Sequence, residues 1–172
     1  MGPEREDWSF KMAEYRSRQT DLGGMEDKVL SVNRIAKKIK GGEKIGFASL
    51  VVVGDKKGKV GLGYGKAADL RSAIEKAQKA AKKAAFLVPL KGPTIARRLT
   101  VRLGAAEILF KPAPRGAGLI AGGVVRDILN LVGVRDVSAK ILGTNNSLNN
   151  AKATIKALKI FVEEGNKKDG TK

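Results

Sequence analysis

The chain of 172 residues contains no cysteine and no histidine. Without cysteine there are no disulfides or thiolate zinc sites, and without histidine there are no Ser–His–Asp or Cys–His nucleophile systems. Aromatic residues make up 5% of the chain, too few for base stacking to dominate nucleic-acid affinity. No apolar run approaches the roughly 20 residues that a membrane-spanning helix needs. We therefore predict a protein that is not an enzyme, needs no cofactor or metal, and does not enter a membrane.

Basic residues are the abundant class. The chain has 34 Lys and Arg against 17 Asp and Glu, a net charge of +17. The first 27 residues hold four basic and seven acidic side chains, so the remaining 145 carry a net charge of +20. Hydrophobic residues make up 42%, as in folded proteins, which predicts a folded binder of polyanions. The first residues resemble no transit or signal peptide, and we expect a soluble, cytoplasmic protein.

The pattern along the chain predicts two small α+β domains. A Pro/Gly-containing break near residue 90 separates two stretches that each combine strand and helix signals. The expected parts are a flexible tail over 1–25, a first domain over 26–89, a linker over 90–93, a second domain over 94–164 and a polar tail over 165–172.

The first domain is expected to begin with strands. Residues 27–39 fit helical and strand spacing about equally well, so periodicity alone leaves both open. Residues 45–53 form a β-rich run, and 54–58 supply Gly and Asp for a turn. A hairpin between 45–53 and 59–65 follows from this order.

The second strand of that hairpin has a face made only of Gly61, Gly63 and Gly65. A glycine-lined face indicates that a helix or another backbone approaches closely. The next segment, residues 70–86, is rich in Ala and Lys and is expected to form a helix with Asp69 as its N-cap. Its lysines are expected to form a solvated outer face.

The second domain has the predicted order ββαβα. Alternating apolar residues indicate the strands, and Gly133 is expected to end the first helix. The expected elements are strands over 99–103 and 108–110, a helix over 122–132, a strand over 137–142 and a helix capped by Ser147 that runs to about Val162.

Basic side chains recur at turns that also contain glycine. At such turns, exposed N–H groups and a basic side chain can bind the same phosphate. The alternative for each group is a solubilising surface. For the glycines of 115–123, a phosphate site before a helix and a tight helix–sheet junction are weighted equally. The candidate phosphate contacts are Arg34, Lys37, Lys38, Lys40 and Lys44 around Gly41 and Gly42; Lys56, Lys57, Lys59 and Lys66 at the first hairpin; and Arg115 and Arg126.

The glycine run 58–66 does not form a nucleotide-binding loop. A phosphate loop requires Ser or Thr after its Lys, and here Ala67 follows Lys66. Val60 also stands where the first glycine of that loop belongs. Only these glycines suggest a phosphotransferase, so that alternative is much weaker than RNA binding.

Taken together, these segments resemble the small-subunit ribosomal protein five family of the bacterial type, over residues 27–161. The chain departs from the family pattern at Glu43, where a basic residue is common, at Ala96-Arg97-Arg98, at Ala117 and at Ser147. The motifs that carry the resemblance are Val32-Asn33-Arg34, Lys40-Gly41-Gly42, Val53-Gly54-Asp55, the glycine run 58–66, Pro112-Ala113, the glycine-rich 116–123 and Ala153-Thr154.

The resemblance implies an N-terminal domain like a double-stranded-RNA-binding fold, with three strands and a helix. It implies a C-terminal α+β domain of the type named after the family, and it selects a strand for residues 28–35. Residues 32–44 match a hairpin loop that reaches rRNA near the neck between head and body, which adds Asn33, Gly41 and Gly42 to the rRNA contacts. A protein-partner side is implied at Gly104, Ala105, Ala106, Glu107 and Lys111.

The function implied is that of a structural component of the small ribosomal subunit. Such a protein binds small-subunit rRNA, neighbours the fourth and eighth small-subunit proteins, lies near the mRNA entrance, steadies head against body and influences decoding accuracy. We expect no homo-oligomer. The alternative is a free RNA-binding regulator or annealing protein that uses the same basic surface.

Overall fold

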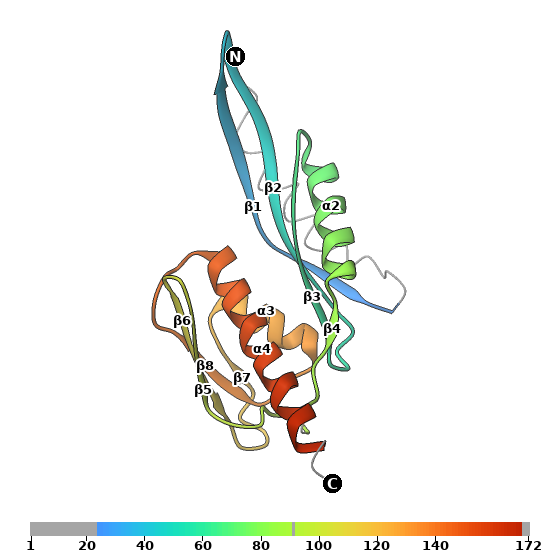
Figure 1. Ribbon diagram of the computed structural model, residues 1–172, viewed down its shortest axis with the longest axis vertical. Coiled ribbons are helices and arrows are strands. Elements are labelled where there is room, and N and C mark those ends of the chain that lie inside the picture. The colour runs from blue at the N-terminus through green and yellow to red at the C-terminus, as the bar shows by residue number, and fades with distance from the viewer. Residues whose placement is uncertain (1–23, 91, 170–172) are drawn as a thin grey trace.

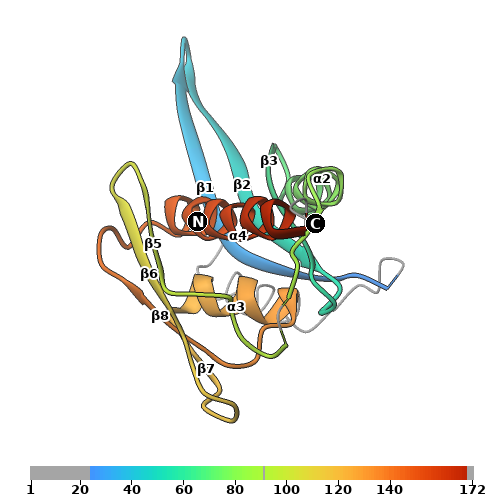
Figure 2. The same ribbon diagram turned by 60° about the horizontal axis from the view of Figure 1, so that its bottom comes forward.

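The computed structural model describes residues 24–90 and 92–169, with side chains as far as Glu163. Two four-stranded sheets are stacked with helices α2 (Leu70–Lys83), α3 (Gly123–Val132) and α4 (Ser147–Asp169). Helix α2 covers the outer face of the first sheet, and α3 and α4 lie between the two sheets (Figures 1 and 2). The fold is therefore α+β, as predicted.

The first sheet has the order β1-β2-β3-β4, from β1 (Glu26–Ile39), β2 (Gly42–Gly54), β3 (Lys59–Ala67) and β4 (Phe86–Leu87). The expectation of a strand for 28–35 is confirmed. Helical and strand spacing looked alike because the sheet is packed on both faces: Val29 contacts the α2 side and Leu30 the side of α3 and α4. Apolar residues therefore occur on both faces of β1.

Beyond Arg34 and Phe47, strands β1 and β2 continue together without β3. This two-stranded ribbon, residues 34–46, is called the arm, and it projects away from the rest of the molecule (Figure 1). Ile39 pairs with Gly42, so the turn at the tip consists of Lys40 and Gly41. Gly41 has φ 95°, a conformation that glycine adopts without steric cost.

The close neighbour expected at the glycine face of β3 is helix α2. A Cβ atom placed on Gly61, Gly63 or Gly65 would stand 2.1, 2.0 or 2.4 Å from a carbonyl oxygen of α2. Helix and sheet are therefore in backbone contact. A small core of Val51, Val53, Ile74, Ala77 and Ala81 fills the remaining space.

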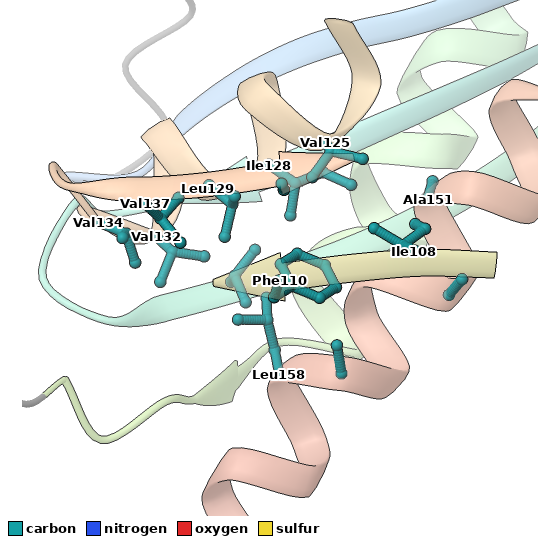
Figure 3. Close-up of a cluster of buried hydrophobic side chains, with 14 of the residues drawn as sticks. Ile108, Phe110, Val125, Ile128, Leu129, Val132, Val134, Val137, Ala151 and Leu158 are labelled. Atoms are coloured by element: carbon teal, nitrogen blue, oxygen red, sulfur yellow. The ribbon is translucent and has the colours of Figure 1, made fainter. Parts of the chain in front are cut away.

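The second sheet has the order β5-β6-β8-β7. Its strands are β5 (Leu99–Leu103), β6 (Ala106–Pro112), β7 (Leu119–Ile120) and β8 (Val137–Ile141), antiparallel except for the β7–β8 pair. The predicted ββαβα order is present, with the two-residue β7 added before α3. Ile108 and Phe110 of β6 point into the core formed with α3 and α4 (Figure 3).

The two sheets share one continuous core. Leu50, Val52 and Val60 of the first sheet belong to the same buried cluster as the residues of α3, α4 and the second sheet. Lys28 Nζ also donates to Asp127 Oδ1 of α3 at 2.6 Å. The described ends of the expected linker also contact this unit: Leu90 packs against the shared core, and the carbonyl of Pro93 accepts the N–H groups of Arg135 and Asp136, both at 2.9 Å.

Three boundaries differ from the sequence expectations. The first helix ends at Lys83 instead of 86, because Phe86 pairs with Val60 as part of β4. The cap of α4 is Asn146, whose Oδ1 accepts the N–H groups of Leu148 and Asn149, so Ser147 is the first helical residue. Helix α4 continues to Asp169 through Gly165, where a polar tail was expected, since one glycine costs a helix only about 1 kcal/mol.

Candidate nucleic-acid interface

The arm carries five basic side chains: Arg34, Lys37, Lys38, Lys40 and Lys44. All five residues are exposed. Among the described residues none of them forms an ion pair with a carboxylate, whereas Lys28, Lys56 and Arg71 elsewhere do. The arm therefore presents five exposed positive charges that no described carboxylate pairs with.

The register of the arm divides these charges between its two faces. Lys37 stands directly opposite Lys44, and Lys38 stands directly opposite Glu43. Opposite residues of an antiparallel pair share a face, and like charges there repel while unlike charges attract. The face with Lys37 and Lys44 should therefore attract anions more strongly. On the other face, Glu43 offsets the positive charge of Lys38.

Backbone N–H groups of the first hairpin turn are bonded within the protein and are not available to a phosphate. The N–H groups of Lys56 and Gly58 donate to the carbonyls of Leu131 and Val132 at the end of α3, both at 2.9 Å. Asp55 Oδ1 accepts the two remaining N–H groups, at 2.8 Å from Lys57 and 2.9 Å from Lys59.

The side chains of that turn are only partly available. Lys56 Nζ donates to Glu26 Oε1 at 2.6 Å, and Lys59 is half-buried, so Lys57 is the one freely exposed cation among these three. Lys66 does not belong to this cluster. It pairs with Ala48 at the opposite end of β3, next to the arm.

The loop before β7 is a tight junction, the alternative that the sequence left open. Asp136 is only 6% exposed, and its Oδ1 accepts the N–H groups of Gly116 at 3.1 Å and Gly118 at 2.9 Å. An internal carboxylate therefore binds two N–H groups of this loop that a phosphate could otherwise have used. Arg115 and Lys111 remain exposed beside this loop.

Removal of that carboxylate is predicted to destabilise the second domain. We expect Asp136→Ala to lower the free energy of unfolding by about 1–3 kcal/mol, because two backbone N–H groups lose a charged acceptor. Asp136→Asn keeps one acceptor oxygen and should cost less. Urea denaturation followed by circular dichroism measures both variants, and equal stability of Asp136→Ala and the wild type would contradict the assignment.

Sequence reasoning found Arg126 but missed its neighbour Lys140. Both residues, with Ile120 and Gly122, line a surface hollow of about 280 Å³ at the start of α3. Lys140 lies on β8, and only the sheet order brings it next to α3. Lys140 is an exposed residue of a strand with alternating burial, a pattern that many lysines with no binding role also have. The sequence pattern therefore does not single it out.

The residues expected on the protein-partner side lie at the β5–β6 turn and on β6. Gly104, Ala105 and Lys111 are exposed, and Glu107 is half-buried. Ala106 is fully buried and therefore has no surface to offer a partner, which corrects its place in that set. The turn is held by Glu107, whose carbonyl accepts the N–H of Leu142 at 2.8 Å.

Comparison with known families agrees with this architecture. Residues 25–89 match the family model described as Ribosomal protein S5, N-terminal domain, and residues 101–161 match the model for Ribosomal protein S5, C-terminal domain. The chain belongs to the ribosomal protein S5 family. It is a structural constituent of the small ribosomal subunit, with a role in translation and RNA binding.

The S5 matches fall on the two halves of one packed unit. The N-terminal match contains the arm and α2, and the C-terminal match contains the second sheet and α3. Within the described residues, no helix has the length and apolarity to cross a membrane, and no group of His, Cys, Asp or Glu could hold a metal ion.

Proposed function

We propose that this S5-family protein binds rRNA of the small subunit chiefly through its arm. The observation that carries the proposal is the set of five exposed arm cations, which form no ion pair with any carboxylate of the described residues. Lys and Arg bind RNA by neutralising phosphates, which releases counterions. Gly41 and Gly42 lie at the tip of the arm, where glycine lets an RNA backbone come close, and Asn33 directly precedes the arm on β1.

Secondary rRNA contacts in the proposal come from Lys57, Lys66, Arg115 and Arg126, which are exposed outside the arm. Lys56 and Lys59 contribute less, because one is paired with Glu26 and the other is half-buried. Phosphate contacts of this kind position an RNA without reading its sequence.

The mechanism proposed is mechanical coupling. Since the core is continuous, RNA bound to the arm is held in a fixed orientation relative to whatever contacts the second sheet. A protein of this kind restrains the head of the subunit against its body and so contributes to translational accuracy. The proposal places the fourth and eighth small-subunit proteins beside it, the former on the side of Gly104, Ala105, Glu107 and Lys111, with mRNA near its entrance.

The test is charge reversal on the arm. We expect the triple variant Arg34→Glu, Lys37→Glu and Lys40→Glu to fold normally, because all three residues are exposed. Its retention on small subunits after a high-salt wash should fall at least about tenfold. Sedimentation of tagged protein from cell lysate measures retention, and a misreading assay measures accuracy.

The matched control reverses Lys76, Lys79 and Lys83 on the exposed face of α2, which changes the net charge by the same amount. This control variant should stay on the subunits. Loss of the control with retention of the arm variant would show that the main contact is misplaced. Release of wild-type protein into light fractions at moderate salt would favour the free RNA-binding alternative.

A further inference from the structure

A hollow of about 300 Å³ lies at the base of the arm, where β3 ends and the β1–β2 ribbon continues alone. Its volume is at the lower end of the range for small-molecule sites. Ile35 lines it from β1 and stands directly opposite Gly46, which has no side chain to fill the space. The hollow therefore has an apolar wall beside bare backbone.

Three lysines line the same hollow. Lys37 and Lys44 are direct cross-strand neighbours, and Lys66 reaches it from the end of β3. None of the described residues that line it is acidic. Like charges directly opposite each other destabilise a strand pair, so an anion between them would relieve a repulsion built into the arm.

The backbone adds further polar groups to this hollow. Strand β2 pairs with β3 only from Phe47 onward, so no strand in the described part of the chain pairs with the outer edge of residues 42–46. Such an edge presents N–H and C=O groups to a ligand. Positive charge, apolar surface and free hydrogen-bonding groups thus meet within one small volume.

We propose that the hollow holds a single unpaired nucleotide of RNA. Its phosphate lies between Lys37, Lys44 and Lys66, and its base lies against Ile35 over Gly46. This inference rests on the proposed function, because the remaining arm cations guide the RNA strand to the hollow. A paired base is stacked inside its helix and does not enter, whereas an extrahelical base costs little to place there.

The test compares two RNA hairpins that differ in one nucleotide. Both carry the same stem with a one-nucleotide bulge, which is an adenosine in one RNA and an abasic residue in the other. The abasic RNA keeps the phosphate and the bend but lacks the base. We expect wild-type protein to bind the adenosine bulge at least about fivefold more tightly, measured by fluorescence anisotropy.

Two variants with the same charge change locate the effect. Ile35→Glu places a carboxylate in the hollow, and Ile39→Glu places one on the same strand four residues away. Neither side chain belongs to a core cluster, so both variants should fold. Both should bind RNA more weakly, but only Ile35→Glu should bring the adenosine-to-abasic ratio close to one.

The outcomes separate this inference from the proposed function. Equal and tight binding of both RNAs by wild type would overturn the inference and leave rRNA binding intact. A ratio that survives Ile35→Glu would overturn the assignment of the base to this hollow. Failure to bind either RNA would overturn both proposals. Tight binding of an acidic peptide that only Ile35→Glu abolishes would assign the hollow to a protein partner and overturn the nucleotide.

Discussion

Gly63→Ala is expected to lower the free energy of unfolding by about 3 kcal/mol or more, although it adds a single methyl group. The new Cβ would stand 2.0 Å from the carbonyl oxygen of Ala77 and 2.5 Å from the nitrogen of Ala81. Both atoms are helix backbone, so no side-chain rotation relieves the overlap. Helix α2 must move off the sheet, which opens the small core beneath it.

The matched control is Gly123→Ala in the first turn of α3. A Cβ atom there meets nothing within 4 Å, and the residue does not have a positive φ. Alanine is the better helix former, so this variant should be as stable as wild type or slightly more stable. Urea denaturation of the two variants gives the comparison. Equal stability of Gly63→Ala and Gly123→Ala would contradict the backbone contact between α2 and β3.

The position of α2 was predictable because the signal is local. Three glycines at every second position leave one face of a strand without side chains, and the Ala-rich helix that follows has small residues to place there. The helix boundary was less predictable, because Phe86 continues an apolar pattern that fits a helix. Its pairing with Val60 depends on a strand more than twenty residues earlier.

Local sequence could not predict whether the N–H groups of the basic turns are free or bonded within the protein. The turn at Asp55 has the expected chemistry, and its carboxylate binds two N–H groups of the turn. Its remaining N–H groups are bonded to Leu131 and Val132, which lie in the other half of the chain. In the same way, Asp136 fills the glycine loop at Gly116 from a distant strand end. Hydrogen bonds to residues distant in the sequence therefore determine which glycine turns keep N–H groups available to a phosphate.

The sequence predicted that five basic residues gather around the turn at Gly41 and Gly42, and the structure shows them together on the arm. Arg34 lies level with the end of β3 and the other four cations lie beyond it, where no third strand of the described residues supplies partners. The hollow at Gly46 could not be predicted from the sequence, because the residues that line it come together only through the register of β1 against β2. A shift of one residue would place Lys37 and Lys44 on opposite faces.

Because the two sheets share one core, removal of a single side chain from that core should destabilise both halves of the molecule. Leu50 is 1% exposed and lies on the face of β2 that packs against the second half of the molecule. We expect Leu50→Ala to lower the free energy of unfolding by about 2–5 kcal/mol, the usual cost of a buried cavity. Because the core is shared, the loss should destabilise both halves, and hydrogen exchange should accelerate in α4 as well as in β2.

Ile45→Ala provides the comparison for Leu50→Ala, since Ile45 is on the same strand but 42% exposed and outside both core clusters. It should leave exchange in α4 unchanged. Faster exchange confined to the first sheet in Leu50→Ala would mean that the halves unfold independently. In that case RNA held by the arm would be joined to the second sheet only loosely, and the mechanical coupling proposed for this protein would lose its physical basis.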